Sequence, residues 1–212
     1  MVREHNSVLA ASEKRLLVNI AGRLPAWINS DHLTFTGAVA MLGIGGCYWA
    51  GGGALWMVIP LLALNWFGDS LDGTLARVRK QERPRYGYYV DHVLDAVGFA
   101  CLFGGLILGG HMSPAIGLGF LAAYFLLIAE ISMATHARGK FKMAFMKVGP
   151  TELRIILAAG TIQLMRSDSF LVLGREWLLF DVGGLVAAAG MLIAFATAAV
   201  RNGVALYNEE RL

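Results

Sequence analysis

Long apolar stretches separated by short polar segments dominate the chain from residue 33 onward. Six of them can be recognised, at about residues 33–50, 54–78, 87–110, 113–135, 150–165 and 177–200. A helix that crosses a bilayer needs about 20 predominantly apolar residues, so we expect one transmembrane helix from each stretch. Gly51, Gly52 and Gly53 favour a tight turn between the first two. The pattern therefore predicts an all-α integral membrane protein with six transmembrane helices.

The first 32 residues have a different pattern, because they contain no long apolar run. Leu17, Ile20 and Leu24 recur at helical spacing among basic residues, which predicts a short amphipathic helix on the membrane surface. Pro25 should end this helix. A partly ordered tail is the alternative, and no secretory signal peptide is expected. We divide the chain into an interfacial segment, 1–32, and a six-helix transmembrane domain, 33–212, which holds the candidate catalytic residues.

Composition agrees with a membrane protein. Hydrophobic residues make up 57% of the chain and charged residues only 16%, against about 25% charged in soluble domains. This balance excludes a disordered chain, a disulfide scaffold and a typical soluble enzyme. Cys47 and Cys101 both lie in apolar runs, so they are expected to be small core residues without a disulfide. The net charge of +3 is mild, and a nucleic-acid partner is not expected.

Basic residues alternate between the loops, which predicts the orientation in the membrane. Lys and Arg gather before the first stretch and in segments 79–85 and 138–147, whereas the loops after the first and third stretches contain none. The positive-inside rule then places both termini and both basic loops in the cytosol. We expect a multi-pass protein of a bacterial inner membrane, with Trp49, Trp56 and Trp177 near the outer interface.

Four carboxylates interrupt the second and third apolar stretches: Asp69, Asp72, Asp91 and Asp95. The spacings i, i+3 and i, i+4 place each pair on one helical face. The connection between the two helices is short, so they should be antiparallel neighbours whose acids meet near the cytosolic side. Charged residues inside a bilayer are costly and usually functional, and oxygen-rich acidic clusters suit Mg²⁺ or Mn²⁺. The alternative is a set of helix caps or ion pairs near the interface.

The sequence around these acids resembles a family signature. Residues 69–77 read Asp-Ser-Leu-Asp-Gly-Thr-Leu-Ala-Arg, and residues 87–95 read Gly-Tyr-Tyr-Val-Asp-His-Val-Leu-Asp. This resembles the signature of the CDP-alcohol phosphotransferase (CDP-alcohol phosphatidyltransferase) family, Asp-x-x-Asp-Gly-x-x-Ala-Arg followed by Gly-x-x-x-Asp-x-x-x-Asp. Every defining position matches, and only the intervening segment, 78–86, is slightly longer than usual.

The resemblance implies a reaction and a site. Family members move a substituted phosphate from a CDP-linked donor to an alcohol acceptor and release CMP. By resemblance, two divalent ions, Mg²⁺ or Mn²⁺, would be bound by the four acids, and Asp95 would also be the general base that takes the proton of the attacking hydroxyl. The residues implied at the CDP donor are Thr34, Gly73, Ala76, Arg77 and Gly87.

Some of these residues have ordinary structural explanations, which stay open. Gly73 and Ala76 are typical of close helix packing, Arg77 of a positive-inside anchor and Thr34 of a helix N-terminus. The resemblance also implies a homodimer in which each subunit keeps its own site. The glycines between 98 and 119 are as typical of a dimer interface as of packing inside one subunit.

The acceptor side is less defined by the sequence. Arg138 and Arg154 are candidate acceptor residues, while Glu130 either contacts substrate or pairs with Arg154. No role is assigned to His92 or His136. The donor is either CDP-diacylglycerol, with a small polar alcohol as acceptor, or CDP-choline or CDP-ethanolamine, with a membrane lipid, diacylglycerol, as acceptor.

A function without catalysis is the alternative to a transferase. Intramembrane acids also occur in divalent-cation channels and transporters. Such proteins place acids along a continuous path near the middle of the membrane, whereas these acids lie toward one face, beside a basic loop suited to nucleotide phosphates. The sequence therefore favours the transferase.

Overall fold

A computed structural model describes residues 10–138, 150–172 and 174–211 of the chain. It is 83% helical. The elements are α1 (Ala10–Arg23), α2 (Ser30–Ala50), η1 (Gly52–Ala54), α3 (Leu55–Val78), α4 (Pro84–Leu108), α5 (Pro114–Arg138), α6 (Pro150–Leu164), β1 (Ser169–Val172), β2 (Arg175–Leu178) and α7 (Leu179–Glu209).

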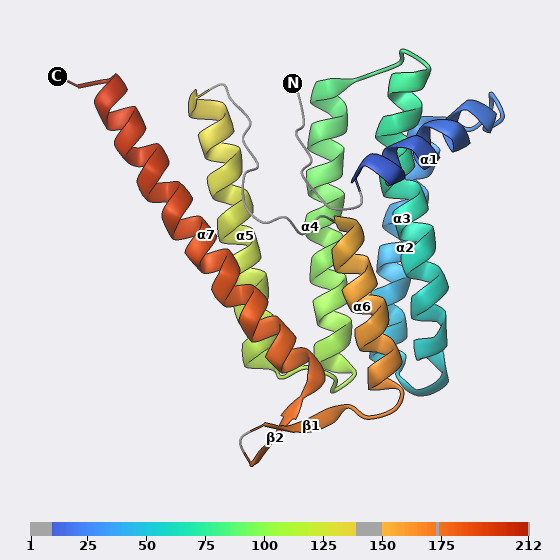
Figure 1. Ribbon diagram of the computed structural model, residues 1–212, viewed down its shortest axis with the longest axis vertical. Coiled ribbons are helices and arrows are strands. Elements are labelled where there is room, and N and C mark those ends of the chain that lie inside the picture. Colours follow the sequence, from blue (N-terminus) through green and yellow to red (C-terminus); the bar gives the residue numbers. More distant parts are fainter. Residues whose placement is uncertain (1–9, 139–149, 173, 212) are drawn as a thin grey trace.

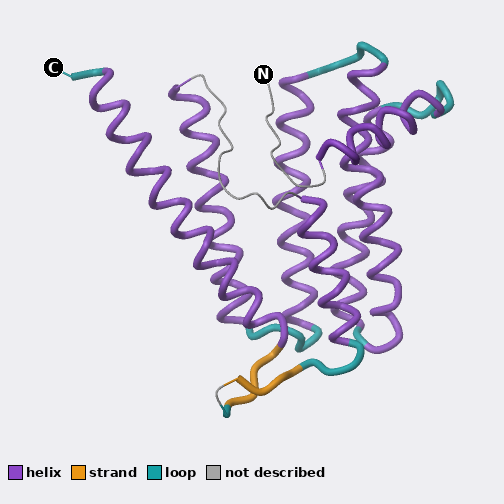
Figure 2. The backbone as a smooth tube through the Cα atoms, in the orientation of Figure 1, coloured by secondary structure: helices purple, strands orange, loops and turns teal. Residues whose placement is uncertain are grey.

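The long helices run up and down between two ends of the molecule (Figure 1). Helix α2 packs against both α3 and α4, α5 packs against α7, and α6 lies against α3 and α7. The α3–α4 connection, α1 and the end of α7 lie at one end of the molecule, with α1 and the end of α7 on opposite sides, while η1 and the hairpin lie at the other end (Figure 2). The predicted antiparallel arrangement of the two acid-bearing helices is therefore confirmed.

Five helices in the described part of the chain are long and apolar enough to cross a membrane: α2, α3 together with η1, α4, α5 and α7. The stretch expected as the fifth span forms α6, which has 15 residues. At about 1.5 Å per residue this helix is about 22 Å long, shorter than the hydrocarbon core of about 30 Å. In Figure 1, α6 begins part-way along α4 and runs to the end that carries the hairpin. The structure thus confirms a helical membrane protein with five spans of sufficient length, and leaves the sixth as a prediction.

The sequence did not predict the hairpin before α7. Strands β1 and β2 pair antiparallel, with Phe170 opposite Trp177, and Gly174 in the turn has a φ of 76°. The last helix was expected to begin at Trp177, but it begins at Leu179 and continues to Glu209. A short apolar run does not distinguish the end of a strand from the start of a helix by its periodicity, which explains the error.

Glycines allow α2 to lie very close to its neighbours. A Cβ atom at Gly68 of α3 would fall 2.5 Å from the carbonyl oxygen of Leu33, and one at Gly105 of α4 would fall 2.0 Å from that of Gly45. Gly98 and Gly109 also face α2. These glycines therefore serve packing inside one subunit, so they give no support to a dimer interface. Helix α2 instead forms the support on which both acid-bearing helices rest.

Helix α1 lies across α3. It buries Leu17 and Ala21 in a cluster with Leu33, Leu71 and Leu75. The helix ends at Arg23, just before Pro25 as expected. Its outer surface exposes apolar and basic side chains alike, those of Lys14, Arg15, Leu16 and Val18. Its position at a membrane surface stays a prediction.

Candidate functional site

Three of the four predicted acids converge. Asp69 of α3 and Asp91 and Asp95 of α4 each offer a carboxylate oxygen, and these oxygens lie within 4.8 Å of one another. Asp69 and Asp91 are partly buried, whereas Asp95 is exposed. Clustered carboxylate oxygens are the ligands that hard divalent cations prefer, so the donor set fits the predicted Mg²⁺ or Mn²⁺.

Asp72 lies beside this group but is held differently. Its carboxylate accepts hydrogen bonds from the Thr34 hydroxyl at 2.6 Å and from the backbone N–H of Gly73 at 2.5 Å. All four acids and Thr34 line one small cavity of about 20 Å³, which is room for about one water-sized species. The structure thus brings Thr34 to the acids, where its direct partner is Asp72.

Arg154 is the cation next to the cluster. Its Nη2 lies 2.5 Å from a carboxylate oxygen of Asp69, and its Nε donates to the side-chain oxygen of Asn65 at 2.7 Å. Asn65 in turn donates to the carbonyl oxygen of Gly37. The remaining nitrogen, Nη1, is buried and has no hydrogen-bond partner among the described residues. A guanidinium fixed on one edge with a donor left over is suited to hold an anionic group.

Asn65 also belongs to this site, and the sequence alone assigns it no role. It lies one helical turn before Asp69 on the same face of α3, and it is 5% exposed. An amide buried in an apolar helix needs hydrogen-bond partners, so its spacing from Asp69 was a usable signal. Its partners, Gly37 and Arg154, come from α2 and α6, and no local pattern identifies them.

The residues expected at the donor lie toward the α3–α4 connection. Arg77 is exposed and donates to the Thr74 hydroxyl at 3.1 Å. At Gly73 the nearest atom to an added Cβ would be Arg77 Nη1, at 3.6 Å. At Gly87 an added Cβ would meet no heavy atom of the described chain within 4 Å beyond its two chain neighbours and its own helix backbone. Neither glycine is therefore explained by close helix packing.

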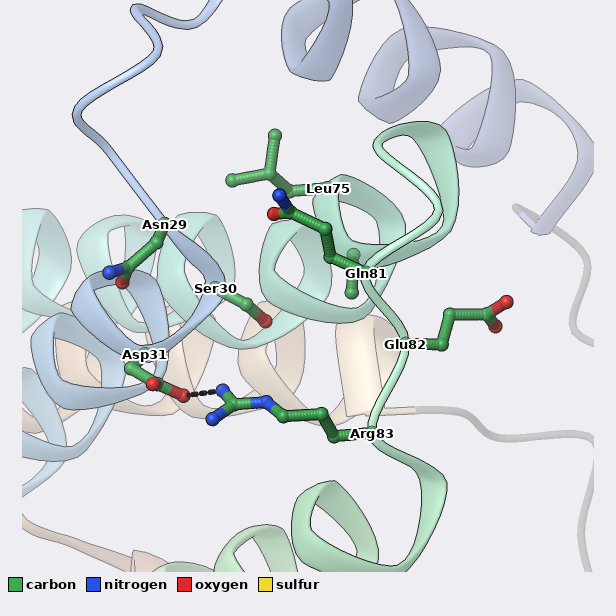
Figure 3. Close-up of a pocket in the computed structure, with 8 residues that line it drawn as sticks. Asn29, Ser30, Asp31, Leu75, Gln81, Glu82 and Arg83 are labelled. Atoms are coloured by element: carbon green, nitrogen blue, oxygen red, sulfur yellow. Dashed lines mark hydrogen bonds and ion pairs between the residues drawn. The ribbon is translucent and has the colours of Figure 1, made fainter.

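A larger cavity of about 430 Å³ lies between the start of α2 and the α3–α4 connection (Figure 3). Ala76 lines it, together with Asn29, Ser30, Asp31, Leu75, Gln81, Glu82 and Arg83. The Arg83 side chain reaches across to bond Asp31, while Glu82 points away (Figure 3). The guanidinium of Arg83 also lies 4.4 Å from the ring centre of Tyr86. The sequence singled out only Ala76 here, because the cavity forms between segments that are distant in the chain.

A hydrogen bond joins residues that line the two cavities. The Ser30 hydroxyl donates to the backbone carbonyl of Asp72 at 2.9 Å, and Ser30 lines the larger cavity while Asp72 lines the smaller one.

Arg138 is engaged elsewhere. It donates to the side-chain oxygen of Asn202 at 2.9 Å and lies 3.4 Å from Glu209, both on α7. Glu130 is buried and accepts a hydrogen bond from Asn202 at 2.7 Å. The pairing of Glu130 with Arg154, considered as an alternative, is thus not what the structure shows. Among the residues it describes, Arg138 joins α5 to α7, and its part at an acceptor stays a prediction.

The two histidines without an assigned role differ in their surroundings. His92 stacks on Tyr88, and its Nδ1 lies 2.9 Å from the carbonyl oxygen of Tyr88 and 4.0 Å from Asp91. It therefore packs at the edge of the acidic cluster. His136 is exposed near the end of α5.

Comparison with known proteins identifies the family. The family model for CDP-alcohol phosphatidyltransferases matches residues 27–200, and the chain belongs to this family. Membership implies an enzyme that transfers a phospholipid headgroup or phosphatidyl group from a CDP-alcohol to an alcohol acceptor. A search of curated proteins finds no match to the chain.

Proposed function

We propose that this protein is a metal-dependent membrane transferase that moves a substituted phosphate from a CDP-linked donor to the hydroxyl of an alcohol, with release of CMP. The observation that carries the proposal is the convergence of Asp69, Asp91 and Asp95 from two antiparallel helices. Their spacing is that of the family signature, and Asp72 lines the same cavity.

The acids provide the binding site for two divalent ions. Asp69, Asp91 and Asp95 would hold one ion, and Asp72 with its neighbours would complete the second. When bound, these ions neutralise the pyrophosphate and the charge that develops during transfer. Thr34 and the Gly73 N–H hold Asp72 in a fixed orientation, and Arg154 does the same for Asp69. The ligands are thus oriented by their own hydrogen bonds, as bound metals require.

Asp95 is the proposed general base. It is the most exposed acid of the three that converge, so an acceptor hydroxyl can reach it. Its carboxylate takes the proton as the acceptor oxygen bonds to phosphorus and the bond from phosphorus to the CMP oxygen breaks.

The larger cavity is the proposed place for the nucleotide. Its volume of about 430 Å³ lies in the usual range of ligand sites, roughly 300–1,000 Å³. Ala76 lines it, Gly73 and Gly87 leave open space nearby, and Arg77 supplies a positive charge for phosphate. A nucleotide here would have its pyrophosphate on the side of Asp72, whose backbone carbonyl accepts a hydrogen bond from Ser30 of the cavity wall.

The proposal also covers the acceptor-binding residues, the location in the membrane and the oligomeric state. Nη1 of Arg154, which has no hydrogen-bond partner among the described residues, would donate to an acceptor or donor phosphate, and Arg138 is a second candidate. CDP-diacylglycerol and CDP-choline or CDP-ethanolamine remain the two donor classes. We place the site at the cytosolic face of a bacterial inner membrane and expect a homodimer by resemblance to the family.

CMP release from the purified full-length protein tests the function. The protein, in detergent or vesicles, is supplied with each donor class, an acceptor panel and Mg²⁺ or Mn²⁺, and both CMP and lipid products are measured. Metal-dependent CMP release with a matching lipid product supports the transferase. Flux of Mg²⁺ or Mn²⁺ into vesicles without CMP release with any donor would instead support a channel or transporter.

A further inference from the structure

One carboxylate oxygen of Glu13 joins three helices. Its Oε1 accepts hydrogen bonds from Trp66 Nε1 at 2.7 Å, from the Thr151 hydroxyl at 2.7 Å and from the Ser70 hydroxyl at 3.4 Å. Glu13 belongs to α1, Trp66 and Ser70 to α3, and Thr151 to the first turn of α6. We call these four residues the Glu13 junction. Figure 1 shows the beginning of α6 beneath the beginning of α1.

Two residues of the Glu13 junction are close in the chain to residues of the candidate site. Ser70 follows Asp69 in the chain, and Thr151 lies one helical turn before Arg154. Arg154 bonds Asp69 and Asn65. The contacts therefore form a closed ring: α1 holds α6 through Thr151, α6 holds Asp69 through Arg154, and α3 returns to α1 through Ser70 and Trp66.

We propose that Glu13 is a positioning residue for the active site, which keeps the first turn of α6 against α3 so that Arg154 stays on Asp69. This proposal rests on the function proposed above. The far part of α6 is held separately, because Thr161 shares a hydrogen bond of 2.7 Å with Tyr48 of α2. Arg154 lies near the N-terminal end of α6, which the Glu13 junction holds, and not near Thr161.

A purely structural role for Glu13 in attaching α1 predicts a different result. Helix α1 has other attachments, because Leu17 and Ala21 are buried against α3. In addition, Arg79 donates to the carbonyl oxygens of Leu24 and Pro25 at 3.0 and 2.9 Å. Thr151→Val removes only the bond from α6 and leaves the bonds from Trp66 and Ser70. This substitution therefore separates the positioning of α6 from the attachment of α1.

The test compares full-length variants in kinetics and hydrogen exchange. Glu13→Ala and Thr151→Val are measured with Thr151→Ser, which keeps the hydroxyl. Thr197→Val and Glu176→Gln are the controls, because both residues are exposed and their hydrogen bonds among the described residues are to Ile193 and Ser169, close to them in sequence. We expect Glu13→Ala and Thr151→Val each to lower kcat/KM for the CDP donor about tenfold, the factor for one hydrogen bond to a charged group. Thr151→Ser and both controls should match the parent.

Hydrogen exchange supplies a readout that does not depend on turnover. The amides of residues 154–157 bond the carbonyls of residues 150–153, the first turn of α6, and they should exchange faster in Glu13→Ala and Thr151→Val. The double variant should be no worse than Glu13→Ala alone, because both changes open the same ring.

Three results would overturn the proposal: unchanged kinetics and exchange in Thr151→Val, equal impairment in Thr151→Ser, or faster exchange confined to α1 in Glu13→Ala. If Glu13→Ala does not fold, Thr151→Val alone decides. If the parent protein releases no CMP with any donor, the proposed function fails, while the exchange measurements still decide whether Glu13 positions α6.

Discussion

Gly73 and Gly87 of the signature can be tested for a role in substrate contact as opposed to helix packing, because replacing each by alanine adds a single methyl group. In Gly87→Ala and Gly73→Ala the folded protein has room for the new atom. Apart from the chain neighbours and the helix's own backbone, no heavy atom of the described chain lies within 4 Å of it at Gly87, and the nearest at Gly73 is the flexible end of Arg77 at 3.6 Å. Alanine is favoured over glycine in a helix by about 1 kcal/mol. Both variants should therefore unfold at the same temperature as the parent or higher.

Activity should respond in the opposite direction if the nucleotide lies against these backbones. A methyl group forced into a filled contact costs roughly 1–3 kcal/mol, which corresponds to a loss of about 5- to 150-fold in kcat/KM for the donor. The assay is CMP release at varied donor concentration, together with thermal unfolding of the same preparation in detergent. The expected result is a lower kcat/KM for the donor with no decrease in the unfolding temperature.

Two further glycines serve as controls. Gly104 of α4 likewise has no contact within 4 Å for an added Cβ beyond its chain neighbours and its own helix backbone, so Gly104→Ala should keep full activity and unfold at the same temperature as the parent or higher. At Gly68 the Cβ would lie 2.5 Å from the Leu33 carbonyl oxygen and 2.6 Å from the Gly37 nitrogen, so Gly68→Ala should destabilise the fold. Full activity in both Gly73→Ala and Gly87→Ala would refute the reasoning that substrate occupies this space, as would a loss of stability in either.

Three other predictions concern the acids and the topology. Asp95→Asn should fold and bind donor but lose turnover, because the amide keeps the size and loses the basicity; a near-normal rate at saturating metal would show that Asp95 is not the base. Asp69→Ala or Asp72→Ala should raise the Mg²⁺ or Mn²⁺ concentration needed for half-maximal activity, and an unchanged requirement would count against these ligands. A cysteine at Tyr86 should react with an impermeant thiol reagent only from the cytosolic side and one at Gly52 only from the other side; the reverse result would overturn the orientation.

Local spacing explains why the acids could be predicted. Asp69 and Asp72, or Asp91 and Asp95, share a face of any α-helix whatever surrounds it, and the short segment between the two helices leaves little choice but antiparallel neighbours. The convergence of three carboxylates within 4.8 Å is the result. The presence of the long helices could be predicted equally well, because an apolar segment in a bilayer satisfies its backbone hydrogen bonds within itself by forming an α-helix.

Contacts between distant residues could not be predicted in this way. Glu13 meets Thr151 across 138 positions, and Arg154 meets Asp69 across 85. A polar residue in a membrane helix must find a partner, but its own sequence neighbourhood does not say which one. Glu130 illustrates this. From the sequence, Arg154 was considered as its partner, whereas in the structure Glu130 accepts a hydrogen bond from Asn202.

The glycine contacts explain how the fold can hold the acids without crowding the substrate. Where α2 meets α3, a Cβ at Gly37 of α2 would lie 3.2 Å from the backbone nitrogen of Asp69 of α3, so the backbone of α2 supports α3 beside a proposed metal ligand. A contact between two backbones cannot relax by a change of side-chain rotamer, and closely packed protein interiors are hard to compress. The position of Asp69 relative to α2 is therefore fixed. Toward the α3–α4 connection the same kind of residue, Gly87, has open space in place of a partner. Glycine thus fixes the acids on the α2 side and leaves room on the other, and this difference is what an added methyl group at Gly68 or Gly87 would measure.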